Sequence, residues 1–141
     1  MRFPQEQRHH PATPDPLRKS RTIQEDASAK GFDWPDISGV LEKVREELDE
    51  IESAWDAGLL DKAGKELGDT LFALVNLARF LGADPVEQLE QANMRFSERF
   101  ALLSNILQRE GRVMSECTLD ELDEVWERVK IQMEPERFGG V

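Results

Sequence analysis

Apolar residues recur every three or four positions along most of this 141-residue chain. Between residues 36 and 58, for example, the apolar positions are Val44, Leu48, Ile51 and Trp55. Spacing of this kind places side chains along one face of an α-helix. The sequence has no alternating run long enough for a β-sheet and no glycine-rich phosphate loop. The pattern therefore predicts an all-α fold, a bundle of four to five helices.

Capping signals and glycines set the expected ends of these helices. We expect helices over about 20–30, 36–58, 61–81, from 84 onward, and 118–133. Residues 84–87 and 118–121 match the capping-box pattern, and Asp61 is a suitable N-cap. Residues 70–78 are apolar almost all round, which predicts that the third helix is central and buried. The stripes of the last two helices are Leu89, Asn93, Phe96, Phe100, Leu103 and Leu107, then Leu122, Val125, Trp126, Val129 and Met133.

The ends of the chain differ in composition from its centre. Residues 1–19 hold four of the seven prolines and both histidines, with little apolar content. A segment of this kind predicts a disordered tail. We expect one helical domain over 20–134 and a flexible C-terminus over 135–141.

Net charge narrows the classes of partner. The chain has 29 acidic and 18 basic residues, a formal net charge of −11, which argues against non-specific nucleic-acid binding. No apolar run approaches the roughly 18 residues of a membrane span. The single cysteine, Cys117, fits a reducing compartment. We therefore expect a cytoplasmic protein that binds neither nucleic acid nor membrane.

Two acidic clusters lie on consecutive predicted helices. Glu46, Glu47 and Glu50 belong to the first cluster, and Glu66 and Asp69 to the second. Carboxylates three residues apart share one face of a helix. Several of them at the edge of an apolar core indicate a site for a hard cation, of which Mg²⁺ is the expected one. A solvated acidic face is the alternative, and the spacing alone leaves both open.

Basic and aromatic residues on the last two helices could bind a polyphosphate or a base. Arg95 and Arg99 are four residues apart, as are Trp126 and Lys130. Paired guanidiniums suit phosphate oxygens, and an indole suits stacking on a nucleobase. An ordinary helix surface and an ordinary core tryptophan are the alternatives. Asn93 lies on an apolar stripe and needs a partner if it is buried.

Together these residues resemble the MazG family of nucleoside triphosphate pyrophosphohydrolases. The family signature reads here as Glu46-Glu47-x-x-Glu50 followed by Glu66-x-x-Asp69. The resemblance covers roughly residues 20–132 and is closest to the C-terminal catalytic repeat of two-repeat members. The other segments that carry it are 31–35 (GFDWP), 43–47, 68–79, 92–100 and 126–130.

The resemblance implies a function and a set of site residues. It implies cleavage of (deoxy)nucleoside triphosphates between the α- and β-phosphates, with Mg²⁺ as cofactor and Mn²⁺ as a substitute, by a homodimer or higher oligomer. The implied metal ligands are Glu47, Glu50, Glu66 and Asp69. Because Glu46 lies beside these ligands in the sequence, it is our own candidate for orienting or deprotonating the attacking water. The implied nucleotide-binding residues are Lys43, Glu46, Arg95, Arg99 and Trp126, to which we add Asn93 and Lys130.

Two departures from the family pattern leave alternatives open. Lys65 stands where members commonly have an acidic residue, and the chain holds one repeat instead of two. A narrower substrate is one alternative, as in the dimeric dUTPases and phosphoribosyl-ATP pyrophosphohydrolases, which share the all-α architecture. A non-catalytic helical interaction module is the other.

Overall fold

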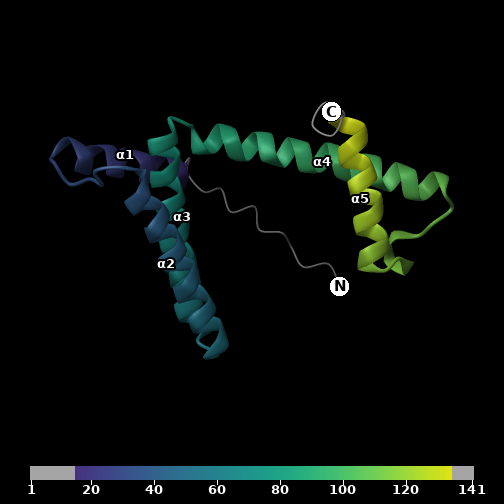
Figure 1. Cartoon of the computed structure of the whole chain (residues 1–141), viewed down its shortest axis with the longest axis horizontal. Coiled ribbons are helices and arrows are strands. Elements are labelled where there is room, and N and C mark those ends of the chain that lie inside the picture. Colours follow the sequence, from purple (N-terminus) through teal and green to yellow (C-terminus); the bar gives the residue numbers. More distant parts are fainter. Residues whose placement is uncertain (1–14, 135–141) are drawn as a thin grey trace, which may run out of the picture. The chain divides into compact units, whose positions relative to one another are not determined.

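The computed structural model describes residues 15–134, and this part of the chain is all-α, as predicted (Figure 1). The α-helices are α1 (Pro16–Ala29), α2 (Ile37–Asp56), α3 (Leu60–Leu81), α4 (Pro85–Arg109) and α5 (Leu119–Met133). A single 3-10 turn, η1 (Met114–Glu116), precedes α5. None of the helices in the described range is long and apolar enough to cross a lipid bilayer.

The chain divides into two compact units, one ending at Gln88 and the other beginning at Leu89, within α4. The sequence had predicted one domain over 20–134. We describe each unit by itself. The expected tail over 1–19 lies mostly outside the described residues, but α1 already begins at Pro16, with Asp15 as its N-cap.

In the first unit, α2 and α3 run side by side as a hairpin, and α1 packs against α3 (Figure 1). The turn between α2 and α3 contains Gly58, whose φ of 71° is easy for glycine alone. Polar contacts hold α1 in place: Gln24 Nε2 donates to the Phe72 carbonyl at 2.8 Å, and Arg21 Nη1 donates to the Ala83 carbonyl at 3.3 Å. Residues 30–36 form a connector from α1 to α2, and the Asp33–Arg79 ion pair ties it to α3 at 2.6 Å.

In the second unit, α4 and α5 pack around a small apolar core. Its buried residues are Leu103, Leu107, Val125 and Val129, none of them more than 5% exposed. Thr118 starts α5 with the complete capping box predicted from the sequence. Of the other two predicted N-caps, Asp84 accepts from the backbone N–H of Val86 at 2.9 Å, whereas Asp61 is wrong: the N-cap of α3 is Leu59, which makes no side-chain cap hydrogen bond.

Several residues predicted to be buried are exposed within the described chain. On α2, Leu48 and Trp55 are 51% and 67% exposed, and the buried positions are Val40, Glu47 and Ala54. The prediction of a buried α3 is wrong for Leu71, Phe72 and Leu74, and that of a buried stripe on α4 is wrong for Leu89, Asn93, Phe96 and Phe100. The reason is the small number of neighbours, because a two-helix hairpin covers only one face of each helix.

Candidate functional site

Three of the predicted carboxylates meet between α2 and α3. One oxygen atom from each of Glu47, Glu66 and Asp69 lies within 4.8 Å of the other two. Glu66 and Asp69 share a face of α3 because they are three residues apart, and the hairpin brings Glu47 of α2 against that face. The sequence indicated the spacing of the carboxylates on each helix. The pairing of α2 with α3 in the structure brings the two clusters together.

Glu47 is the buried member of the cluster, at 6% exposed. Its Oε1 accepts from Lys43 Nζ at 2.8 Å, whereas Oε2 has no hydrogen-bond partner among the described residues. A buried carboxylate oxygen without a partner is costly. Three carboxylate oxygens within 4.8 Å of one another suit a divalent cation, so the residues present fit the metal that the resemblance implies.

Neighbouring charges shift the pKa values of this group in opposite directions. The hydrogen bond from Lys43 holds the pKa of Glu47 below its ordinary value. The pKa of Glu66 is raised, first by its hydrogen bond to Glu47, then by burial and by the charges of Glu47, Asp69 and Glu50. Glu66 therefore carries the proton of the Glu47–Glu66 pair more readily, and a bound cation would displace that proton.

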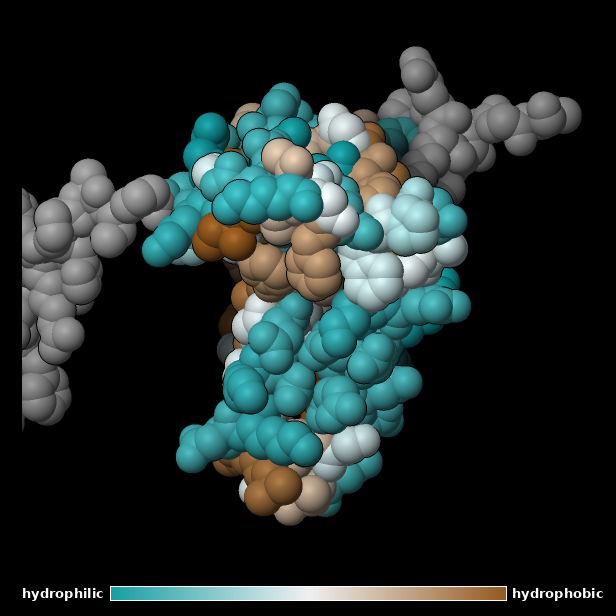
Figure 2. All heavy atoms as spheres, turned by 90° about the vertical axis from the view of Figure 1, so that its left-hand side faces the viewer, coloured by the Kyte–Doolittle hydropathy of each residue, from teal (hydrophilic) through white to brown (hydrophobic). Residues whose placement is uncertain are grey.

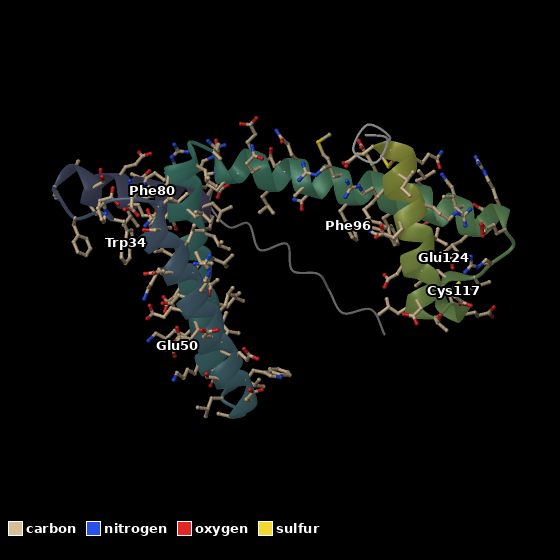
Figure 3. The ribbon with its side chains drawn as sticks, viewed as in Figure 1. Trp34, Glu50, Phe80, Phe96, Cys117 and Glu124 are labelled. Carbon is tan, nitrogen blue, oxygen red and sulfur yellow. The ribbon has the colours of Figure 1, made fainter. Side chains whose placement is uncertain are left out.

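The other two predicted acidic residues lie outside this group. Glu50 is exposed on α2, where Figure 3 shows it, although its charge contributes to the raised pKa of Glu66. Glu46 is also exposed, and its carboxylate lies 3.5 Å from Lys43 Nζ. Lys43 thus contacts both Glu46 and the buried Glu47.

A hollow of about 340 Å³ opens beside the cluster, within the first unit. Its lining includes the charged residues Lys43, Glu47 and Asp69, and also Trp34, Phe72 and Asn76. The last three were not predicted as site residues. For Trp34, the sequence feature that could have indicated a site residue was segment 31–35, in which two aromatic residues follow a glycine in a short connector.

The predicted nucleotide-binding residues beyond Lys43 and Glu46 all lie in the second unit. Arg95 and Asn93 are exposed on α4, while Arg99 is bound to Glu134 at 2.6 Å. Lys130 pairs with Glu127 at 2.7 Å. The Trp126 ring lies 5.5 Å from that of Phe96, labelled in Figure 3, and packs against the core of this unit.

Comparison with known proteins finds homologues of this chain. No family model matches the chain. A protein of Thermotoga maritima named nucleoside triphosphate pyrophosphohydrolase/pyrophosphatase MazG is 45% identical over 114 residues, 81% of this chain and 44% of that protein. The chain is a homologue of MazG proteins. The nucleoside triphosphate pyrophosphohydrolase of Escherichia coli K12 is 38% identical over 118 residues, 82% of this chain and 45% of that protein.

The MazG resemblance predicted from the residues is thereby confirmed, and its restriction to the C-terminal repeat stays a prediction. The chain spans less than half the length of these two MazG relatives. A shorter match, 38% identical over 65 residues, links it to the uncharacterised protein YabN of Bacillus subtilis.

Proposed function

We propose that this chain is a Mg²⁺-dependent nucleoside triphosphate pyrophosphohydrolase that converts (d)NTPs to (d)NMPs and pyrophosphate. The observation that carries the proposal is the Glu47–Glu66–Asp69 cluster, which holds a buried carboxylate oxygen without a partner. Two MazG relatives named for this activity support it. The acidic cluster alone would suit many metal proteins, and the homology narrows the choice.

The chain's own residues have distinct roles in this proposal. Glu47, Glu66 and Asp69 hold the metal, with Glu50 as an outer ligand, and the bound ion supplies neutralisation of phosphate charge and a more acidic water. Lys43 keeps Glu47 ionised through its 2.8 Å contact. Glu46, exposed beside Lys43, takes the proton of the attacking water.

The proposal keeps nucleotide-binding roles for residues of α4 and α5, and these roles rest on the resemblance to the relatives alone. Arg99 keeps donors for phosphate oxygens while it binds Glu134, because a guanidinium has five N–H groups. In this proposal Arg95, Asn93 and Lys130 make further polar contacts to the nucleotide. Trp126 contacts the nucleotide with the part of its ring that the core leaves accessible.

Product analysis tests the activity. We would incubate the protein and Mg²⁺ with each of the eight common NTPs and dNTPs and with dUTP, and separate the products by ion exchange. We expect monophosphate and pyrophosphate, lost with EDTA and in Glu50→Gln or Asp69→Asn. A preference for dUTP alone would favour the narrower substrate class. We expect each variant to lose at least a factor of ten in rate, which corresponds to about 1.4 kcal/mol of activation free energy. A variant that keeps more than about a tenth of the wild-type rate would contradict the role assigned to its residue.

Thermal unfolding tests the metal site separately from turnover. A cation at a hundred times its Kd stabilises the folded state by about 2.7 kcal/mol. We expect Mg²⁺ and Mn²⁺ to raise Tm in the wild type and not in Glu66→Gln. Glu52→Gln, at an exposed carboxylate of α2, is the matched control and should keep the response. Equal responses in all three proteins would indicate a solvated acidic face and favour the interaction module.

We also propose that the chain forms a homodimer or higher oligomer. Leu60, Leu67, Leu71 and Leu74 lie on one face of α3 and are 42–61% exposed. Exposed apolar side chains in a row indicate a protein interface, and a second copy would cover them. A sedimentation mass of 16.1 kDa at micromolar concentration, the monomer value, would contradict this proposal.

A further inference from the structure

Asn76 and Arg79 lie one turn apart on α3 and have no role in the proposal above. We propose that Asn76 donates a hydrogen bond from Nδ2 to an oxygen atom of the substrate, and that Arg79 is a positioning residue that holds the Asn76 amide in the orientation this contact needs. The inference rests on the proposed function for the identity of the substrate. Its structural basis is the set of hydrogen bonds around Arg79.

Hydrogen bonds from Arg79 set the orientation of the Asn76 amide. Nε and Nη2 of Arg79 donate to Asn76 Oδ1 at 3.1 and 2.7 Å. The amide oxygen must be the atom that faces Arg79, because a guanidinium can only donate. Nδ2 is therefore the end of the amide that Arg79 leaves free, and it has no hydrogen-bond partner among the described residues.

Arg79 is itself held in place by two other contacts. Its Nη1 and Nη2 donate to the two carboxylate oxygens of Asp33 at 2.8 and 2.6 Å, and Ser28 Oγ donates to the same carboxylate at 2.7 Å. The guanidinium carbon of Arg79 lies 4.9 Å from the centre of the Phe80 ring, labelled in Figure 3. The guanidinium is therefore fixed, and it orients the Asn76 amide before a ligand arrives.

The Asp33–Arg79 ion pair lies at the connector, where the surface is partly apolar. The side chains of Arg79 and Asp33 are only 16% and 23% exposed. Figure 2 shows hydrophobic surface in the upper part of its view, where Figure 1 places α1 and the connector, above a mainly hydrophilic surface. Limited access of water strengthens an ion pair, because a lower dielectric constant screens the charges less. The contact with Asp33 therefore keeps the Arg79 guanidinium beside Asn76.

Asn76 lines the hollow that contains the acidic cluster. It is partly buried there, together with Lys43, Glu47 and Asp69, whereas Arg79 is not part of that lining. Asp69 and Asn76 are seven residues apart on α3, which is two helical turns, so they share a face and lie about 10 Å apart along the helix axis. A substrate with its phosphates at the carboxylates and its remainder along α3 would therefore pass the Asn76 amide.

The orientation of the amide matters because acceptors dominate this hollow. Glu47 and Asp69 present carboxylate oxygens, and the ammonium of Lys43 already contacts Glu46 and Glu47. Phosphate and sugar oxygens of a nucleotide accept hydrogen bonds, so they need donors. With Oδ1 bound to Arg79, the Asn76 amide supplies a donor. Turned by 180°, the same amide would present a further acceptor and repel the substrate oxygen.

Calorimetry with ligands that resist turnover tests the donor. We would measure, with Mg²⁺ present, the Kd of the α,β-imido analogues of dATP, dGTP, dCTP and dUTP and that of inorganic triphosphate. Asn76→Leu removes the amide at nearly constant volume, and we expect it to raise Kd about tenfold or more, the effect of one hydrogen bond. Asn105→Leu, at an exposed asparagine of α4, is the matched control and should keep the wild-type Kd. A loss with both kinds of ligand assigns the contact to a phosphate oxygen, and a loss with the nucleotides alone assigns it to a sugar oxygen. An unchanged Kd for every ligand would overturn the inference.

A double-mutant cycle tests the positioning role of Arg79. Arg79→Lys keeps a charge for Asp33, but its single nitrogen cannot hold both carboxylate oxygens and the Asn76 amide. We expect Arg79→Lys to bind the analogues as weakly as Asn76→Leu, and the double variant to bind no more weakly than either, because Arg79 acts through Asn76. Losses that multiply in the double variant would show a merely structural Arg79 and overturn its positioning role. Where Asn76→Leu does not fold, Asn76→Asp takes its place, since it keeps an acceptor for Arg79.

Turnover separates this inference from the proposed function. Binding of an analogue that depends on Asn76, without turnover of any (d)NTP, would support the inference and overturn the proposed activity. Turnover with an unchanged Kd in Asn76→Leu would do the reverse. A wild type that binds none of these ligands would overturn both.

Discussion

Gly39 and Trp34 are in close contact, and we predict that Gly39→Ala distorts the hollow beside the acidic cluster. Gly39 lies in the first turn of α2, and Trp34 precedes that helix in the connector. A Cβ at position 39 would lie 2.6 Å from Cε3 of the Trp34 ring. The ring lines that hollow, so the glycine leaves room for it there.

The geometry sets the size of the effect. Ordinary contact begins at 3.4 Å, so the ring must retreat by about 0.8 Å from its 2.6 Å approach. Overpacking of this kind typically costs about 1–3 kcal/mol. Replacing a helical glycine by alanine returns up to about 1 kcal/mol through helix propensity. We therefore expect Gly39→Ala to lose between zero and about 3 kcal/mol of unfolding free energy.

Gly64→Ala is the matched control, because no described atom outside its own helix neighbourhood lies within 4 Å of the added Cβ. That variant should gain up to about 1 kcal/mol. Urea unfolding followed by circular dichroism compares the stability of the two variants, and product analysis with (d)NTPs compares their turnover. We expect Gly39→Ala to be the less stable variant by about 1–3 kcal/mol and to hydrolyse (d)NTPs more slowly. Two equally stabilised variants with unchanged turnover would refute the reasoning.

Three further predictions concern other parts of the chain. The Arg79 guanidinium and the Ser28 hydroxyl hold the pKa of Asp33 well below its ordinary value of 3.8, so its stabilising effect is present above that pH and lost as the pH falls through the folded-state pKa. The Tm difference between wild type and Asp33→Asn should therefore be constant near neutrality and shrink below pH 3.8; a constant difference down to pH 1 would contradict this pairing. Leu107→Ala, at a position 2% exposed, should cost about 2–5 kcal/mol in urea unfolding, and a loss under about 1 kcal/mol would contradict a packed core there. In Gly68→Ala the added Cβ meets no described atom within 4 Å, so the substitution should stabilise a monomer. Lower dimer affinity of this variant in sedimentation would show that a second copy approaches α3 at position 68. Unchanged dimerisation would exclude position 68 from the interface.

The sequence predicted the helices well because their signals are local. The ends of α2 and α5 and the C-terminal end of α3 follow from periodicity, glycines and the Thr118 capping box, all readable within one or two turns. Burial was predicted less well. Leu48, Trp55 and Leu71 follow helical spacing as buried residues do, but the described chain has no second neighbour to cover them. Periodicity marks an apolar face and does not specify which surface covers it.

The acidic cluster was predictable for the same local reason, residue by residue. The i, i+3 spacing put Glu66 and Asp69 on one face, and the resemblance implied that Glu47 joins them. Glu50 was implied equally, yet it lies exposed outside the group. Whether Glu47 or Glu50 lies near Glu66 and Asp69 depends on which side of α2 faces α3. The packing of the two helices determines that side, and the sequence of neither helix alone predicts it.

A hollow of about 420 Å³ between α1, the connector and α3 depends on a kind of contact that helical periodicity does not indicate. The only buried residue of α1 is polar Gln24, and α1 is fixed to α3 by that amide and by Arg21. An α1 held by apolar packing would have brought Ile23 and Phe72 together and filled the space between the helices. Because backbone carbonyls of α3 and of the turn that follows it accept the anchoring bonds, the apolar side chains remain on the walls of the hollow. The anchoring bond also turns Gln24 Oε1 into the unpartnered acceptor, so one polar contact accounts both for the open space and for the chemistry offered inside it.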